Sequence, residues 1–196
     1  MQVSISTRIR YTWVMTDQNA KDFNLSEETW DQVRTILGKL YYEVDMGVAR
    51  LSAIHADRLQ CRQGCNGCCA DDLTVFVIEA HNIQHHHANL LTNESPAEPG
   101  VCAFQDAQGG CRIYEHRPYV CRTQGLPFRW LDEHDDGRVV EMRDICPLND
   151  IGDPIEELPE DHCWAIGPFE ELLANLQGSI DGGDLTRVAL RSLWKA

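Results

Sequence analysis

Nine cysteines carry most of the chemistry that this sequence of 196 residues could perform. Four of them lie close together in the chain, at Cys61, Cys65, Cys68 and Cys69. Thiolate sulfur is a soft, negatively charged ligand that binds zinc, iron and copper. The two-residue gap between Cys65 and Cys68 lets a tight turn aim both sulfurs at one ion, and nearby glycines permit the backbone conformations of such a turn.

A second set of cysteines is spread further along the chain and comprises Cys102, Cys111, Cys121 and Cys146. The two sets together could supply two four-sulfur sites, or one four-sulfur cluster with four thiols left over. Neighbouring side chains in a loop do not easily point the same way. We therefore expect Cys68 and Cys69 to serve different metals, or one to be a ligand that the other supports. These eight cysteines are the predicted ligands of a zinc ion or of iron, most simply as an iron–sulfur cluster.

Disulfides and buried free thiols are the competing uses of cysteine. The cysteine count is odd and the first residues contain no apolar run typical of an export signal, so a disulfide framework is disfavoured. Buried free thiols behave as small hydrophobic groups. For Cys163, which lies apart from the others, a buried thiol and a metal ligand both stay open.

Charge and hydropathy narrow the classes of partner. The net charge is -14, from 31 acidic and 17 basic residues. Such a surface repels phosphates and anionic lipid. No segment approaches the roughly 18 apolar residues that a membrane-spanning helix requires. We expect a cytoplasmic protein with a metal ion as its partner and with no nucleic-acid or membrane partner, while a protein partner is unknown.

The elements that must position the cysteines belong to a small, mainly helical α+β domain. We expect residues 1–25 to be an N-terminal extension and residues 26–196 to be a single domain whose motif core is 61–122. Ser26 is a candidate N-cap. Apolar residues recur every three or four positions after it, which predicts one amphipathic helix up to residue 54, or two helices broken near Gly38 or Gly47.

The remaining elements are short. They are a helix at 79–91, a β-hairpin at 102–114 around a Gly-Gly turn, a helical turn opened by Pro118 that carries Cys121, a second hairpin at 128–142, and two closing helices at 169–176 and 185–194. The cysteine loop and the two hairpins should converge on the metal, which then staples distant segments and supports the fold.

Histidines offer a further set of ligands. His81 and His85 share a helix face at a spacing that can chelate zinc. His116 and His162 lie close to cysteines in the sequence. A solvated polar helix face is the simpler interpretation of the first pair.

The cysteine pattern resembles the YkgJ-type cysteine-cluster family, the zinc- or iron-chelating domain named for its CxxCxxCC motif. The resemblance rests on the four clustered cysteines, on the run at 73–80, on Cys102-Ala103-Phe104, and on the block Cys-x-Ile-Tyr-x-x-Arg-Pro-x-x-Cys-Arg at 111–122. It covers about residues 61 to 122, and the first gap is three residues where the family has two. It implies metal chelation by these cysteines.

Two alternatives to a plain metal-binding protein follow. Some members of that family, the flagellin lysine methylases, look like iron–sulfur enzymes that use S-adenosylmethionine, which implies a protein methyltransferase. A structural zinc module for protein–protein contact is the other alternative. The sequence singles out no catalytic residue for either one.

Overall fold

The computed structural model describes residues 25–134 and 136–194, so the predicted N-terminal extension lies outside the described residues except for its last position. The helices are α1 (Glu27–Ile54), α2 (Val77–His86), α3 (Ala88–Asn93), α4 (Tyr119–Arg122) and α5 (Pro168–Asp181). The strands are β1 (Thr74–Phe76), β2 (Phe128–Glu133), β3 (Val139–Asp144), β4 (Trp164–Ala165) and β5 (Arg187–Ala189). Four 3-10 helices complete the described part: η1 (Tyr114–His116), η2 (Ile155–Glu157), η3 (Glu160–His162) and η4 (Leu190–Trp194). The predicted α+β class is confirmed.

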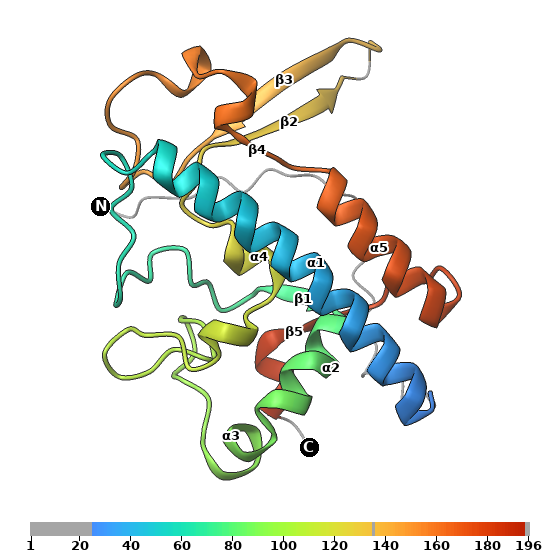
Figure 1. Ribbon diagram of the computed structural model, residues 1–196. Helices are drawn as coiled ribbons and strands as arrows, with labels where there is room; N and C mark the ends of the chain where they lie inside the picture. The colour runs from blue at the N-terminus through green and yellow to red at the C-terminus, as the bar shows by residue number, and fades with distance from the viewer. Residues whose placement is uncertain (1–24, 135, 195–196) are drawn as a thin grey trace.

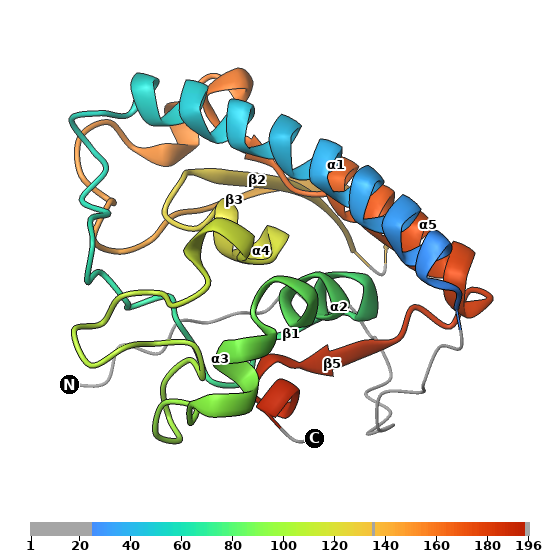
Figure 2. The ribbon, with the colours of Figure 1, turned by 60° about the horizontal axis from the view of Figure 1, so that its bottom comes forward.

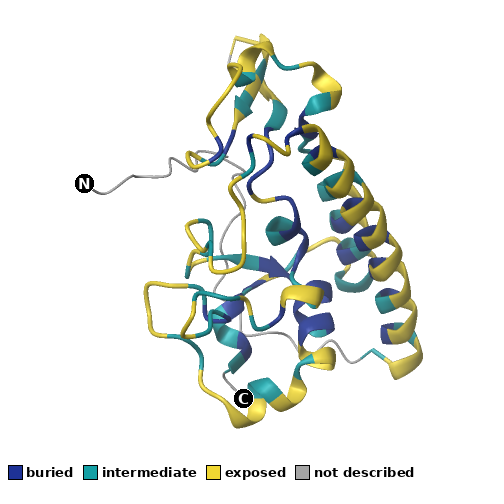
Figure 3. Ribbon diagram, turned by 60° about the vertical axis from the view of Figure 1, so that its left-hand side comes forward, coloured by how far each residue is buried: buried dark blue, intermediate teal, exposed yellow. Residues whose placement is uncertain are grey.

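Helix α1 runs the length of the molecule and packs against α2, α4 and α5 (Figure 1). The Ser26 hydroxyl accepts a hydrogen bond from the backbone N–H of Thr29, and Glu27 and Glu28 follow in the first turn, as the cap prediction requires. One side of the helix is buried and the other exposed, as Figure 3 shows. The buried residues are Trp30, Val33, Leu37, Leu40, Tyr41, Val44 and Leu51.

The alternative of a break in this helix is wrong, because α1 passes through both glycines without interruption. Nothing lies within 4 Å of where a Cβ would sit on Gly38. A Cβ on Gly47 would lie 2.7 Å from Cζ3 of Trp164. Gly47 therefore allows the Trp164 ring to pack directly on the helix backbone.

A buried carboxylate joins α1 to α2 and α4. Glu79 accepts hydrogen bonds from the Tyr41 hydroxyl (3.0 Å), the Tyr119 backbone N–H (2.9 Å) and the Phe76 backbone N–H (3.2 Å). Burial raises the pKa of Glu79 above its ordinary value. The helix predicted at 79–91 is present but divided into α2 and α3 at His87.

Two small sheets are present, and Figure 2 shows α2 and α4 lying between them. One has the order β3-β2-β4, in which β2 and β3 form the hairpin predicted at 128–142 and β4 adds in parallel. The other pairs β1 with β5, so that Val75 lies opposite Val188. The helix predicted at 185–194 is therefore wrong in its first half, because pairing with a strand far away in the sequence overrides the local helical pattern.

The hairpin predicted at 102–114 is also wrong. Only one isolated bridge forms there, between Gln105 and Cys111. The Asp106 carboxylate accepts hydrogen bonds from the backbone N–H groups of Gln108 (2.8 Å) and Gly110 (2.7 Å) and so closes a compact loop. Local side-chain bonds of this kind compete with strand pairing.

Both cysteine-bearing loops, 61–69 and 102–111, lie on the same flank of the molecule (Figures 1 and 2). In the described part of the chain, no helix combines the length and the apolar composition needed to cross a membrane.

Candidate metal centre

The clustered cysteines stand on two successive tight turns. The backbone N–H of Cys65 donates to the carbonyl of Arg62, and that of Cys69 donates to the carbonyl of Asn66, both at 2.9 Å. Gly64 adopts a left-handed conformation with φ of +83°, which a residue with a side chain resists. The turns predicted from cysteine spacing are therefore present.

A buried asparagine joins the first cysteine to the last of the eight. The Nδ2 of Asn149 lies 3.3 Å from Sγ of Cys61. The backbone N–H of Asn149 donates to the carbonyl of Cys146 at 2.7 Å. Its side chain also bonds the carbonyl of Gly125 (2.7 Å) and the backbone N–H of Gln60 (2.8 Å). Sequence reasoning missed Asn149, because an isolated asparagine in a loop gives no periodic or spacing signal.

Gly125 completes the surroundings of Cys61. Its φ is +95°, and a Cβ there would lie 2.5 Å from Sγ of Cys61. Only glycine fits this close approach of backbone to sulfur.

The first group of thiols contains Cys61, Cys65 and Cys146. Burial raises the pKa of Cys61, and the hydrogen bond from Asn149 partly offsets that rise. The charges of Cys65, Cys146 and Cys68 raise the pKa further. Such electrostatic influence weakens with distance, so these four thiols lie in the same region of the molecule.

The second group contains Cys69, Cys102, Cys111 and Cys121. The backbone N–H of Cys102 donates to the carbonyl of Cys69 at 3.1 Å. Burial raises the pKa of Cys121, and the charges of Cys102, Cys111, Glu79 and Cys68 raise it further. These cysteines come from the 61–69 loop, the 102–111 loop and α4, and their thiols influence one another's pKa.

Cys68 and Cys69 stand at the border of the two groups. The Cys69 thiol donates a hydrogen bond to the sulfur of Cys68, which raises the pKa of Cys69 and lowers that of Cys68. Arg117 acts in the same direction on Cys68, because a nearby guanidinium favours the thiolate. Cys68 also influences both Cys61 and Cys121, so it is a neighbour of each group.

All nine cysteines are free thiols. Among the residues that the structure describes, no three Cys, His, Asp or Glu side chains converge on a common point in a way that could hold a metal ion. Cys163 is buried directly before β4, with its sulfur 4.0 Å from Nη1 of Arg143 in β3. That setting favours the buried-thiol interpretation of Cys163.

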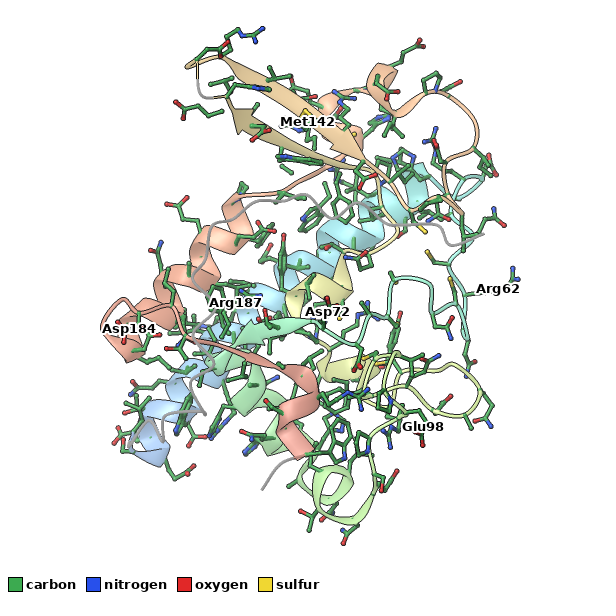
Figure 4. All side chains as sticks on the ribbon, turned by 180° about the vertical axis from the view of Figure 1, so that it is seen from behind. Arg62, Asp72, Glu98, Met142, Asp184 and Arg187 are labelled. Carbon is green, nitrogen blue, oxygen red and sulfur yellow. The ribbon has the colours of Figure 1, made fainter. Side chains whose placement is uncertain are left out.

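Arginines directly after cysteines serve mainly other partners. Arg62 is exposed and points away from its loop (Figure 4). Arg122 is buried and pairs with Asp45 at 2.6 Å. Arg112 pairs with Glu94 at 3.3 Å. Arg117, which does not follow a cysteine, is the arginine whose charge lowers the pKa of Cys68. Its guanidinium covers the ring of Tyr114 at 3.8 Å from the ring centroid.

The histidines considered as metal ligands contact other aromatic side chains. The ring of His81 stacks on Trp30, with centroids 3.6 Å apart, so it faces α1. His116 stacks on His86 (3.9 Å) and forms a 3.1 Å hydrogen bond with His87. His116 therefore contacts the end of α2 instead of completing a cysteine group.

Comparison with known families gives one match. Residues 60–147 match the model of the family named CxxCxxCC, described as "Putative zinc- or iron-chelating domain". Neither the curated proteins nor the solved structures contain a significant match to the chain. The matched segment extends beyond the predicted core of 61–122 and includes all eight cysteines of the two groups, whereas Cys163 lies outside it.

Proposed function

We propose, from the match of residues 60–147 to the model of the zinc- or iron-chelating CxxCxxCC family, that the protein holds zinc or iron in two adjacent centres, each bound by four cysteine thiolates. The first centre uses Cys61, Cys65, Cys68 and Cys146. The second uses Cys69, Cys102, Cys111 and Cys121. Four thiolates are the ligand set of structural zinc sites and of iron–sulfur clusters.

The proposal is supported by the spacing of the eight free thiols, by their place within residues 60–147, and by the electrostatic influence that members of each group exert on one another. Asn149 connects the loops of Cys61 and Cys146 by hydrogen bonds, and the backbone bond from Cys102 to Cys69 joins the loops of the second group. Adjacent residues in a chain rarely direct their side chains to one point. Assigning Cys68 and Cys69 to different centres removes that conflict.

Because no three potential ligands converge on a common point among the described residues, metal binding must draw the thiols of these loops closer together. A bound metal requires thiolates, so binding releases the thiol protons and replaces the bond between Cys69 and Cys68. Gly64 and Gly67 give the 61–69 loop backbone freedom for the change. The Asn149 N–H on Cys61 and the Arg117 charge beside Cys68 stabilise thiolate charge once it forms.

Anaerobic purification followed by elemental analysis and a visible spectrum tests the proposal. Stoichiometric zinc in a colourless protein would identify structural or chelating centres, and iron with matching sulfide in a coloured protein would identify iron–sulfur clusters. The double substitution Cys65→Ser with Cys68→Ser should lower the metal content. The matched control Cys163→Ser should leave it unchanged, and equal metal in the double variant and the wild type would refute the proposal.

A further inference from the structure

A pocket of about 430 Å³ lies where the C-terminal end of α1 meets the segment 151–162. Figures 1 and 2 show this end of α1, in cyan, beside the orange segment that carries η2 and η3. The same two parts of the chain lead to Cys61 and follow Cys146, but the pocket is lined by other residues. Its size suits a small organic molecule.

A buried guanidinium without a counter-ion lines the pocket. Arg58 is only 7% exposed. Its Nη2 donates to the backbone carbonyl of Asp153, while Nη1 is buried and has no hydrogen-bond partner among the described residues. No carboxylate in the described part of the chain forms an ion pair with Arg58. A buried charge left in this way is costly, and an anionic group of a ligand would relieve the cost.

Acidic and apolar side chains share the same walls. Asp57 and Asp153 line the pocket, and neither carboxylate forms an ion pair with any described residue. Ile54, Ile151 and Leu158 supply an aliphatic surface, and the first two are exposed. The pocket therefore contains one positive charge, two negative charges and a hydrophobic patch.

A hydrogen bond between two histidine residues holds the walls of the pocket together. His55 is buried, and its Nε2–H donates to the backbone carbonyl of His162 at 2.7 Å. This bond ties the end of α1 to η3. The two walls of the pocket are therefore held in place by the protein itself, before any ligand binds.

We propose that this pocket binds a free α-amino acid with an aliphatic side chain. The carboxylate pairs with Arg58, because guanidinium matches carboxylate geometry. The ammonium group lies beside Asp57 and Asp153, and the side chain packs on the isoleucines and the leucine of the walls. A zwitterion is the class of ligand that gives each charge an opposite partner, whereas an inorganic anion would meet two carboxylates.

Calorimetric titration of the full-length, metal-loaded protein with four probes tests the proposal. The probes are L-leucine, 4-methylpentanoate, 3-methylbutylamine and inorganic phosphate. Leucine should bind about tenfold or more tightly than 4-methylpentanoate, which lacks the ammonium group, and than 3-methylbutylamine, which lacks the carboxylate. Absence of leucine binding, or tighter binding of phosphate than of leucine, would overturn the proposal.

Matched variants separate the pocket from general effects. Arg58→Gln should weaken leucine binding by about tenfold or more. Arg50→Gln is the control, because Arg50 is an exposed arginine of the same helix that also bonds a carbonyl of this segment, that of Asp161 at 3.0 Å. Equal leucine affinity in the wild type and Arg58→Gln would contradict the proposal.

Asp57→Asn provides a test that does not disturb the interior, because Asp57 is exposed. This variant should weaken leucine binding several-fold and leave 4-methylpentanoate binding unchanged. An unchanged leucine affinity in both Asp57→Asn and Asp153→Asn would remove the proposed ammonium site. These results do not depend on which metal the cysteines hold.

Discussion

Asn149 shows how one residue outside the cysteine motif organises the candidate centre. It is fully buried, at 0% exposure, and its side chain bonds a sulfur, a carbonyl and a backbone N–H from two segments that are far apart in the sequence. Hydrogen bonds around metal ligands are part of what sets their orientation and charge. The sequence revealed the thiols by their spacing, but it contained no sign of this partner, which lies 88 positions from Cys61.

Replacing Asn149 with alanine should weaken both the fold and the first metal centre. We expect Asn149→Ala to lower the free energy of unfolding by about 2–3 kcal/mol, because buried polar groups lose their partners. Metal affinity should fall about 10–100-fold. Urea unfolding and competition with a chromophoric chelator measure the two effects.

Asn93→Ala is the matched control for this substitution. Asn93 makes one exposed hydrogen bond, to the carbonyl of Asn89, so its loss should change stability by no more than about 0.5 kcal/mol. Equal effects of the two substitutions would contradict the role assigned to Asn149.

At the scale of elements, the long-range strand pairings decided which sequence predictions failed. The capped helix α1, the turn after Pro118 and the β2–β3 hairpin follow from local signals and were predicted correctly. The β1–β5 pair joins segments more than a hundred residues apart, and β4 adds in parallel to β2 from another distant segment. Such pairs depend on the tertiary fold, so a local pattern of apolar residues at 185–194 indicated a helix instead.

The two glycines of α1 provide a prediction at this scale. Gly47→Ala should destabilise the protein by about 1–3 kcal/mol, because the new methyl group would press on the Trp164 ring. Gly38→Ala should stabilise it by about 0.5–1 kcal/mol, because Gly38 is an exposed helical position with free space around it. Thermal unfolding of both variants checks the opposite signs, and a stabilising Gly47→Ala would refute the packing role of Gly47.

At the scale of the whole molecule, stability should depend on pH through His81, a half-buried histidine. Burial, followed by the charge of Arg34, lowers the pKa of His81 to about 4 from the ordinary value of 6.5. The unfolded chain then binds a proton between about pH 6.5 and pH 4 that the folded chain does not. The contribution of His81 is therefore fully present above pH 6.5 and is lost as the pH falls through that window.

His81→Phe should reduce this loss, because phenylalanine can stack on Trp30 but cannot be protonated. We expect a smaller fall in the free energy of unfolding between about pH 7 and about pH 5 than in the wild type. His134→Gln is the control, since His134 is exposed in the β2–β3 turn. Urea unfolding at both pH values measures the slopes, and identical slopes in the wild type and His81→Phe would contradict the prediction.

The cysteines of the proposed centres could be named from the sequence, whereas their surroundings could not. Spacing and thiol chemistry named the eight cysteines, and the family match at 60–147 contains all of them. The proposed division into two groups depends on the folded chain, in which Cys146 influences the pKa of Cys61 across a long stretch of sequence. The close approach of the Gly125 backbone to the sulfur of Cys61 likewise depends on tertiary structure.

The most direct test of two separate four-cysteine centres is the metal content of two double variants. It is measured by native mass spectrometry on protein shown to be folded by circular dichroism. Cys61→Ser with Cys65→Ser removes two ligands of the first centre, and Cys102→Ser with Cys111→Ser removes two ligands of the second. With two separate centres, we predict that each variant keeps half of the wild-type metal. Loss of all metal from both folded variants would show one shared centre and contradict the division into two.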